Sequence, residues 1–117
     1  TADELARMRA SVDEIFVHDN IYAYITKLVS ATRDNQYIEL GVSPRGTIAC
    51  ARMVKAWALL NGRTYVIPED VEQVFADVTK HRIVLNTRAR VSHVTEEAVI
   101  RQILSEIKQP TTYLEKL

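Results

Sequence analysis

The chain is poor in the residues that make turns and cross-links. Its 117 residues include three glycines, three prolines and one cysteine. So few turn-forming residues favour a small number of long helices over a many-stranded β fold. The single cysteine, Cys50, cannot form a disulfide within the chain. This fits a reducing compartment, and we expect a cytoplasmic protein.

Excess charge and long apolar runs are also missing. Fifteen basic residues balance fifteen acidic ones, so the formal net charge at pH 7 is +0. A dedicated nucleic-acid binder neutralises phosphates with an excess of lysine and arginine, so nucleic acid is an unfavoured partner. No apolar run approaches the roughly 18 residues that span a membrane, and the N-terminus lacks the pattern of a signal peptide.

The chain has the size of one domain and an ordinary core. Apolar residues make up 47% of it, which is typical of a globular protein. A chain of this length buries roughly two-thirds of its unfolded surface and can fold without disulfides or metals. It begins with Thr1 rather than methionine. We therefore expect a fragment of a longer protein.

Apolar residues at helical spacing predict an all-α domain of five helices. The predicted helices run from about residue 1 to 13, 19 to 32, 44 to 61, 68 to 82 and 95 to 109. Their predicted caps include a capping box of Thr1 and Glu4, then Asp19, Ser43 and Thr95. Gly62 is expected to close the third helix in a left-handed conformation. The face of that helix that carries Met53, Trp57 and Leu60, widened by Cys50 and Val54, is predicted to lie in the core.

Very short extended segments are expected between the helices. They are residues 15–17, 65–67 and 83–85, each a run of apolar residues. Two of the runs that precede helices can pair as a small parallel ribbon. Residues 33–42 and 86–93 are expected to be loops, and residues 111–117 a tail with no assigned structure.

One short stretch of the chain, Gly41-Val42-Ser43-Pro44-Arg45-Gly46-Thr47, has glycines spaced as in a phosphate-binding P-loop. The P-loop pattern G-x-x-x-x-G-K-[ST] needs a lysine where this chain has Thr47. Pro44 also removes a backbone N–H that such a loop would use. We therefore exclude a P-loop.

The same stretch fits the start of a helix. Ser43 suits the N-cap, and Pro44 suits the first helical position. Arg45 then opposes the helix dipole, at a cost of roughly 0.3–1 kcal/mol. Gly46 costs up to about 1 kcal/mol relative to alanine. Such a pair of unfavourable residues is expected where function requires it, here an anion such as phosphate. The alternative is a solvated arginine beside a loop.

Other candidate sites are weaker. Residues 80–93 hold four basic side chains and no acid, and could contact nucleic acid or an acidic partner. Charge at a helix end followed by a solvated loop explains them better, because no aromatic residue is interleaved for base stacking. The three histidines lack the spacing of metal ligands. Cys50 is expected to be a buried structural thiol, and no catalytic set of residues is visible.

Several stretches resemble one known family. Residues 41–46, GVSPRG, resemble the G-[AV]-S-P-R-[AG] signature of MoxR-type AAA+ ATPases. Residues 58–71, ALLNGRTYVIPEDV, resemble a second stretch of that family, and residues 81–83 (HRI) and 17–25 (VHDNIYAYI) resemble two more. The match covers about residues 1–108 and corresponds to the C-terminal helical lid. Ile67 stands where the family often has threonine, which removes a cap from the fourth helix.

The resemblance assigns roles to residues of this chain. Residues 1–110 would be an AAA+ lid domain, with 111–117 a tail. Arg45 matches the sensor 2 arginine, which reaches the phosphates of ATP, and Ser43 and Pro44 set the helix start that directs it. ATP and Mg²⁺ would bind in the longer protein, whose upstream AAA+ core holds the remaining catalytic groups. The fragment alone would not hydrolyse ATP.

The resemblance also implies what the longer protein does. Such a protein would be an ATP hydrolase that couples hydrolysis to remodelling or maturation of partner proteins, as a ring oligomer with six subunits as the expected number. The sequence does not identify the client protein. The alternative is a non-catalytic helical protein-interaction module, and a nucleic-acid binder is less favoured.

Overall fold

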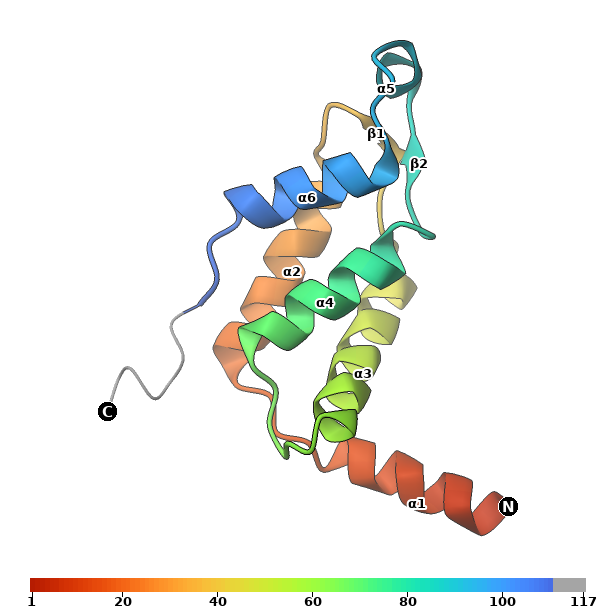
Figure 1. Cartoon of the computed structure of the whole chain (residues 1–117), viewed down its shortest axis with the longest axis vertical. Coiled ribbons are helices and arrows are strands. Elements are labelled where there is room, and N and C mark those ends of the chain that lie inside the picture. The colour runs from red at the N-terminus through yellow and green to blue at the C-terminus, as the bar shows by residue number, and fades with distance from the viewer. Residues whose placement is uncertain (111–117) are drawn as a thin grey trace.

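The computed structural model describes residues 1–110, and the predicted tail at 111–117 lies outside the described residues. The described part is mostly helical, as predicted, with six helices and two short strands (Figure 1). In chain order these are α1 (Ala2–Asp13), α2 (Asp19–Arg33), β1 (Ile38–Leu40), α3 (Pro44–Leu60), α4 (Pro68–Thr79), β2 (Val84–Leu85), α5 (Thr87–Val91) and α6 (Glu96–Glu106).

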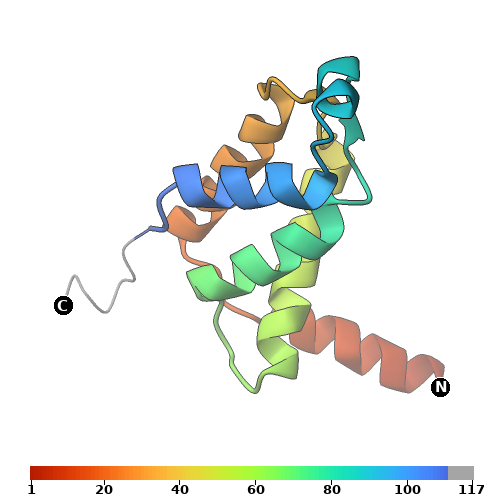
Figure 2. The ribbon, with the colours of Figure 1, turned by 45° about the horizontal axis from the view of Figure 1, so that its top comes forward.

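Four helices build the core of the domain. Helix α3 packs against α2 and α4, and α6 packs against α2 and α4 from the other side. Helix α1 projects from one end of this bundle and contacts α3, while α5 and the two strands lie at the opposite end (Figures 1 and 2). The start of α3 therefore lies beside the end of α2 and near the strands, far from α1.

The buried face of α3 differs from the predicted one. Its buried residues are Gly46, Cys50, Val54 and Ala58, spaced four apart. Met53 and Leu60 are exposed, and Trp57 keeps 38% of its surface exposed, so Trp57 is not a core residue. Apolar side chains surround almost the whole of α3, so helical spacing alone does not identify the inner face. The small residues face inward because α2 and α4 approach α3 closely.

The predicted parallel ribbon is present. Phe16 and Tyr65 form a parallel bridge. The Phe16 N–H donates to the Thr64 carbonyl at 2.9 Å, and the Val66 N–H donates to the Phe16 carbonyl at 2.9 Å. This bridge joins the connection before α2 to the connection before α4, and so fixes the starts of two core helices relative to each other.

Two predicted loops contain regular structure. Residues 33–42 include β1, which pairs antiparallel with β2, and residues 86–93 include α5, capped by Asn86. A three-residue strand is stabilised by its distant partner, so local sequence gives no signal for it. The first prediction was wrong because the contacts that stabilise β1 are tertiary. The second was wrong although a local cap was present, since Oδ1 of Asn86 accepts the Ala89 N–H at 3.0 Å.

Helix ends differ from prediction in three places. Helix α2 is capped by His18 rather than Asp19, because the His18 ring accepts the Asn20 N–H at 3.1 Å. Helix α4 ends at Thr79, so the basic residues 80–82 follow the helix instead of forming its last turn. Helix α6 ends at Glu106, four residues before Pro110. The left-handed Gly62, with φ 78°, closes α3 as predicted.

Candidate functional site

The predicted start of α3 is confirmed. Ser43 is the N-cap, and its Oγ accepts the Gly46 N–H at 3.1 Å. Pro44 is the first residue of the helix, and Arg45 is the second. Because Pro44 fixes its own φ and Ser43 is held by its cap, the backbone that carries Arg45 has little freedom.

The side chain of Arg45 projects into solvent. Its surface is exposed, and the ion pairs found within residues 1–110, Thr1–Glu4 and Arg63–Asp70, do not include it. The positive charge at the helix start is therefore not compensated by a carboxylate among the described residues. A guanidinium in this state can bind an anion that arrives from outside the domain.

The turn before Arg45 is fastened to the end of α2. The Val42 N–H donates to Oγ1 of Thr32 at 3.0 Å, and Nε of Arg33 donates to the Val42 carbonyl at 2.9 Å. Gly41 lies so close to α2 that an added Cβ would stand 2.7 Å from the Thr32 carbonyl oxygen. Only glycine fits there without moving backbone.

Gly46 has a packing role within the domain. It is buried, and a Cβ at this position would stand 2.9 Å from Cγ1 of Val42 and 3.5 Å from Cδ of Arg82. Its missing side chain therefore lets Val42 and Arg82 lie against the first turn of α3. The sequence-based explanation, that Gly46 makes room for an anion, is not needed to account for this residue.

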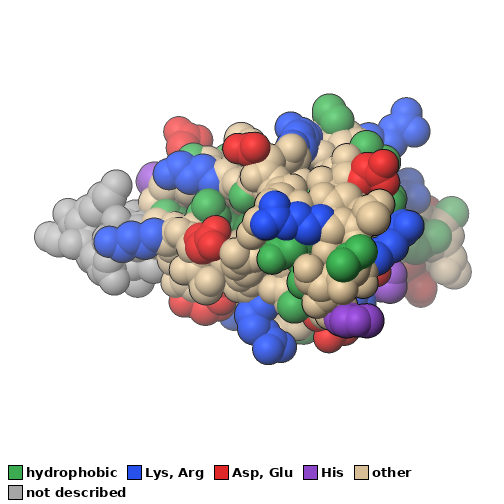
Figure 3. All heavy atoms as spheres, turned by 90° about the horizontal axis from the view of Figure 1, so that it is seen from above, with side chains coloured by type: hydrophobic (Ala, Val, Ile, Leu, Met, Phe, Trp, Pro, Cys, Tyr) green, Lys and Arg blue, Asp and Glu red, His purple; other side chains and the backbone are tan. Residues whose placement is uncertain are grey.

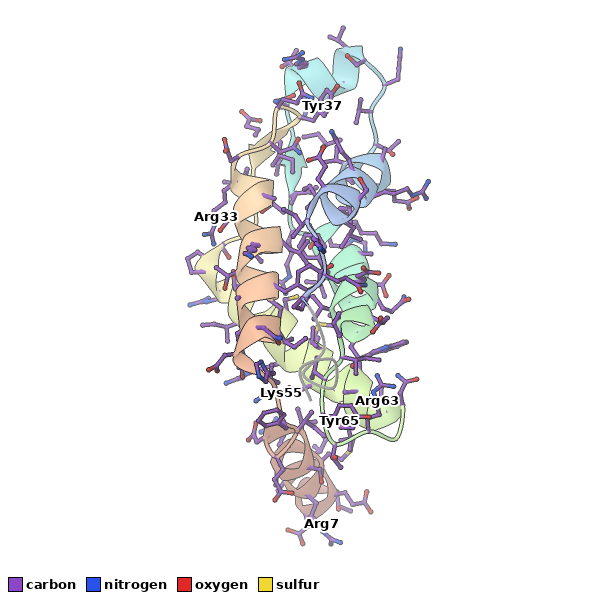
Figure 4. All side chains as sticks on the ribbon, turned by 90° about the vertical axis from the view of Figure 1, so that its left-hand side faces the viewer. Arg7, Arg33, Tyr37, Lys55, Arg63 and Tyr65 are labelled. Carbon is purple, nitrogen blue, oxygen red and sulfur yellow. The ribbon has the colours of Figure 1, made fainter. Side chains whose placement is uncertain are left out.

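A hollow of about 540 Å³ lies beside the helix start. Its lining residues are Arg33, Leu40, Gly41, Val42, Ser43, Pro44 and Arg82. Arg33 projects from the end of α2 above the first turn of α3 (Figure 4). Two arginines and no acidic residue line the hollow, so its potential is positive. Of the predicted site residues, Ser43 and Pro44 line it and Arg45 lies on the adjoining turn.

A buried ion pair fixes the start of α4. Asp70, 2% exposed, pairs with the half-buried Arg63 and accepts the Ile67 N–H at 2.9 Å. Asp70 thus supplies one half of a capping box, while Ile67 has no side-chain acceptor for the other half. Burial raises the pKa of the Asp70 carboxyl, while the Ile67 N–H and Arg63 act in the opposite direction. Arg63 and Tyr65 lie next to each other beyond the end of α3 (Figure 4).

The basic residues of 80–93 do not form one site. Arg82 lines the hollow at the α3 start, whereas Lys80 lines a different hollow together with Glu96 and Glu97. Arg88 stacks over the ring of Tyr37, 5.9 Å from its centre. Seen from the α5 end, basic side chains alternate with acidic and apolar ones (Figure 3). This distribution favours solvated charge over a nucleic-acid surface.

Other site types find no support among residues 1–110. No group of three histidine, cysteine or acidic side chains is placed to hold a metal ion there. None of the helices described in that range is both long and apolar enough to cross a membrane. Cys50 is buried as predicted, and burial raises the pKa of its thiol to about 11.

An apolar groove that was not predicted from the sequence lies between α1 and α3. This hollow of about 730 Å³ is lined by Leu5, Met8, Arg9, Val12, Asp13, Arg52, Met53 and Ala56. Helix α1 has no buried residue. The signal was present, because Leu5, Met8 and Val12 follow helical spacing. Spacing shows which side of a helix is apolar but not whether another element covers it.

Comparison with known families identifies the domain. The model of the AAA lid domain matches residues 30–103. The chain belongs to the AAA lid domain family. This AAA lid domain resembles MoxR-type proteins, which confirms the family expected from the GVSPRG stretch, and lid domains of this kind associate with an AAA+ core.

Several relatives extend the match over most of the lid. Protein YeaC of Bacillus subtilis, described as uncharacterized, is 37% identical over 103 residues, which cover 88% of this chain and 32% of YeaC. Chaperone MoxR1 of Mycobacterium tuberculosis is 32% identical over 116 residues, 92% of this chain and 31% of MoxR1. The lid therefore spans about a third of the length of these relatives.

A solved structure supports the same fold. The crystal structure of a candidate ATPase from Cytophaga hutchinsonii superposes with a TM-score of 0.80 at 31% sequence identity. The superposed region covers 87% of this chain and 34% of that one. The arrangement of helices described above is thus also found in about a third of a longer ATPase-like chain.

Proposed function

We propose that this lid supplies the sensor 2 arginine, Arg45, to an ATP site formed with the AAA+ core of a longer protein. The longer protein would bind ATP with Mg²⁺ and hydrolyse it as a ring oligomer, with six subunits as the expected number. Its lid would couple hydrolysis to remodelling or maturation of partner proteins. The name of the MoxR1 relative, a chaperone, supports this proposal.

The observation that carries the proposal is the state of Arg45. Its charge opposes the dipole of α3, lies in solvent and lacks a carboxylate partner among the described residues. The backbone that carries it is nevertheless held by the Ser43 cap, by Pro44 and by the end of α2. A fixed backbone and an unpartnered guanidinium are what a phosphate ligand from another domain requires.

The proposed chemistry is electrostatic. A guanidinium near the γ-phosphate stabilises the charge that develops during phosphoryl transfer. ATP offers one more phosphate than ADP to Arg45, so ATP favours the arrangement in which the lid is closed over the nucleotide. Loss of the γ-phosphate would weaken that contact and release the lid. The lid alone would not hydrolyse ATP, because the groups that hold the metal and the water would come from the core.

ATP turnover of the longer protein tests this proposal. Arg45→Ala should lower kcat/KM for ATP by about 100-fold, the usual cost of losing one charge-stabilising donor. Arg101→Ala, which removes an exposed arginine from α6, is the matched control and should leave turnover unchanged. Circular dichroism of both variants should match the wild type. Equal turnover and nucleotide affinity in Arg45→Ala and wild type would overturn the sensor role.

The apolar groove between α1 and α3 favours a second candidate, a protein-interaction module without a role in ATP chemistry. This function would lead if Arg45→Ala had no effect on the longer protein. Substitution of Met8 or Met53 by glutamine would then weaken binding to a partner while ATP turnover stayed constant. If Arg45 has the sensor role, Arg45→Ala should lower ATP turnover more than either methionine substitution does.

A further inference from the structure

The last two residues of α2 contact the segment that precedes Arg45. Thr32 is a polar residue with 0% exposure, and a buried hydroxyl needs hydrogen-bond partners. It has two: its Oγ1 donates to the Val29 carbonyl at 2.6 Å and accepts the Val42 N–H at 3.0 Å. The first bond keeps the hydroxyl in place on α2, and the second reaches across to the turn before α3.

Arg33 also contacts Val42, through the carbonyl of that residue rather than its N–H. Its Nε donates to the Val42 carbonyl at 2.9 Å, so both backbone polar groups of Val42 are bonded to α2. The guanidinium lines the hollow at the start of α3 and has no carboxylate partner among residues 1–110. Among the described residues, Arg33 therefore donates a hydrogen bond to the turn before α3 and takes part in no ion pair.

These bonds fix the approach to Arg45 residue by residue. Val42 is tied to α2, Ser43 is held by its cap to Gly46, and Pro44 has a restricted φ. Arg45 follows directly. A loss of the Val42 bonds would remove this restraint from the start of the segment, and the first turn of α3 could then tilt.

We propose that Thr32 and Arg33 are positioning residues for Arg45, which aim its guanidinium at the phosphate of a nucleotide held by the AAA+ core. This inference rests on the proposed sensor role of Arg45. Charge stabilisation depends steeply on geometry, and a displacement of about 1 Å can cost about 100-fold in rate. The end of α2 thereby contributes to ATP chemistry without contacting the nucleotide.

A double-mutant cycle in the longer protein tests the inference. Thr32→Val keeps the shape of the side chain but removes the hydroxyl, and should lower kcat/KM for ATP by about 5- to 50-fold. Thr32→Ser keeps the hydroxyl and should keep kcat/KM for ATP near the wild-type value. Thr26→Val is the matched control, because the Thr26 hydroxyl bonds only its own helix, to the Tyr22 carbonyl at 2.9 Å. It should leave turnover unchanged.

The Arg45→Ala background separates positioning from stability. If Thr32 acts through Arg45, Thr32→Val should change turnover by less than about twofold once Arg45 is absent. A purely structural role predicts the same fold-loss in both backgrounds, matched by the loss of folded protein in a thermal melt. That result would overturn the inference, as would wild-type turnover in Thr32→Val.

Arg33 gives an independent arm of the test. Arg33→Met keeps the apolar stem and removes the donor to Val42, and should lower turnover about as Thr32→Val does. Arg101→Met is its control. Arg33→Lys should rescue part of the loss, since the ammonium can still donate to a carbonyl. No change in Arg33→Met would remove Arg33 from the proposal and leave Thr32 alone.

Hydrogen exchange of the lid makes the two failures distinguishable. In the 117-residue chain, the Val42 amide should exchange about tenfold faster in Thr32→Val than in wild type or Thr32→Ser. If this occurs and Arg45→Ala has no effect on turnover, the sensor role fails while the fastening is real. If Arg45→Ala is inactive but Thr32→Val is fully active, the positioning role fails and the sensor role stands. Unchanged Val42 exchange would contradict the fastening itself.

Discussion

The two ends of α3 differ in how they are completed. At the N-terminal end, α2 bonds both backbone groups of Val42, and Gly41 and Gly46 let the neighbouring segments approach closely. Toward the other end, Met53 lines the groove formed with α1, and Met53 and Leu60 both keep exposed apolar side chains. The first end is satisfied within the lid itself. The second presents apolar surface that nothing in the described chain covers.

The difference distinguishes a segment that is bonded within the lid from a surface that is available for contact with another protein or domain. Polar backbone groups at a buried turn must be bonded for the domain to fold, so the N-terminal end of α3 is complete without a partner. Exposed apolar surface costs little in a single domain and gains free energy only when another surface covers it. This lid spans about a third of the length of its relatives. A single helix of it carries both an internally bonded turn and uncovered apolar surface.

The largest expected effect concerns Gly41. Gly41→Ala should lower the free energy of unfolding of the lid by about 2–3 kcal/mol, because the new Cβ meets the backbone of Thr32 at 2.7 Å. Denaturant unfolding of the 117-residue chain measures this. Gly62→Ala is the control: nothing lies within 4 Å of its Cβ, and its φ of 78° costs only about 1 kcal/mol. Equal losses would show that the close approach to α2 is relaxed in solution.

A smaller effect on the free energy of unfolding is expected from ionisation of Cys50, in the buried middle of α3. Burial raises the pKa of Cys50 from 9.0 to about 11, against the opposing effect of Arg82. The folded chain therefore keeps the thiol proton between pH 9 and 11, where the unfolded chain loses it. Stability should fall as pH rises through this window, by about 1.4 kcal/mol at pH 10.

Unfolding free energies of wild type and Cys50→Ala, measured from pH 7 to 10.5, check this expectation. The variant should lose less stability over the window than the wild type. Some pH dependence remains in both, because the pKa of the buried Tyr24 is raised to about 12. Parallel curves for the two proteins would mean that Cys50 does not titrate differently in the folded and unfolded states.

The smallest effect is expected at the open end of α3. Leu60 is 78% exposed, so Leu60→Ala should change the free energy of unfolding by less than about 0.5 kcal/mol. Val54→Ala on the buried face of the same helix should cost about 2 kcal/mol and serves as the reference. A loss at Leu60 as large as that at Val54 would mean that another surface covers Leu60 in solution, for example by dimerisation.

Local sequence predicted the helix starts well. Thr1, Ser43 and Thr95 were predicted as caps, and each accepts a backbone N–H in the first turn of its helix. These predictions succeed because a cap is formed by residues three positions apart. The placement of Arg45 follows from the same reasoning, since its position in α3 depends only on the cap before it.

Features that depend on distant residues were not predicted. Strand β1 and helix α5 lie in segments that were expected to be loops. Strand β1 is stabilised by its pairing with β2. Asn86, which precedes α5, is held by its side chain, which donates to the Gln36 carbonyl at 2.7 Å. The inner face of α3 was assigned to Met53, Trp57 and Leu60, widened by Cys50 and Val54. Cys50 and Val54 are buried as predicted, but the rest of the buried face is formed by Gly46 and Ala58. Apolar residues on all sides of a helix leave this choice to its neighbours.

The sequence by itself determined an all-α lid, the start of α3 at Pro44 and the place of Arg45 in its first turn. These features follow from spacing, capping and proline geometry, which act over a few residues. Tertiary structure decided that Thr32 and Arg33 hold the turn before Arg45, and that Gly41 must be glycine. The reason is physical: Arg33 and Val42 are nine positions apart with no local signal for contact, and folding of α2 against α3 brings them within hydrogen-bond distance.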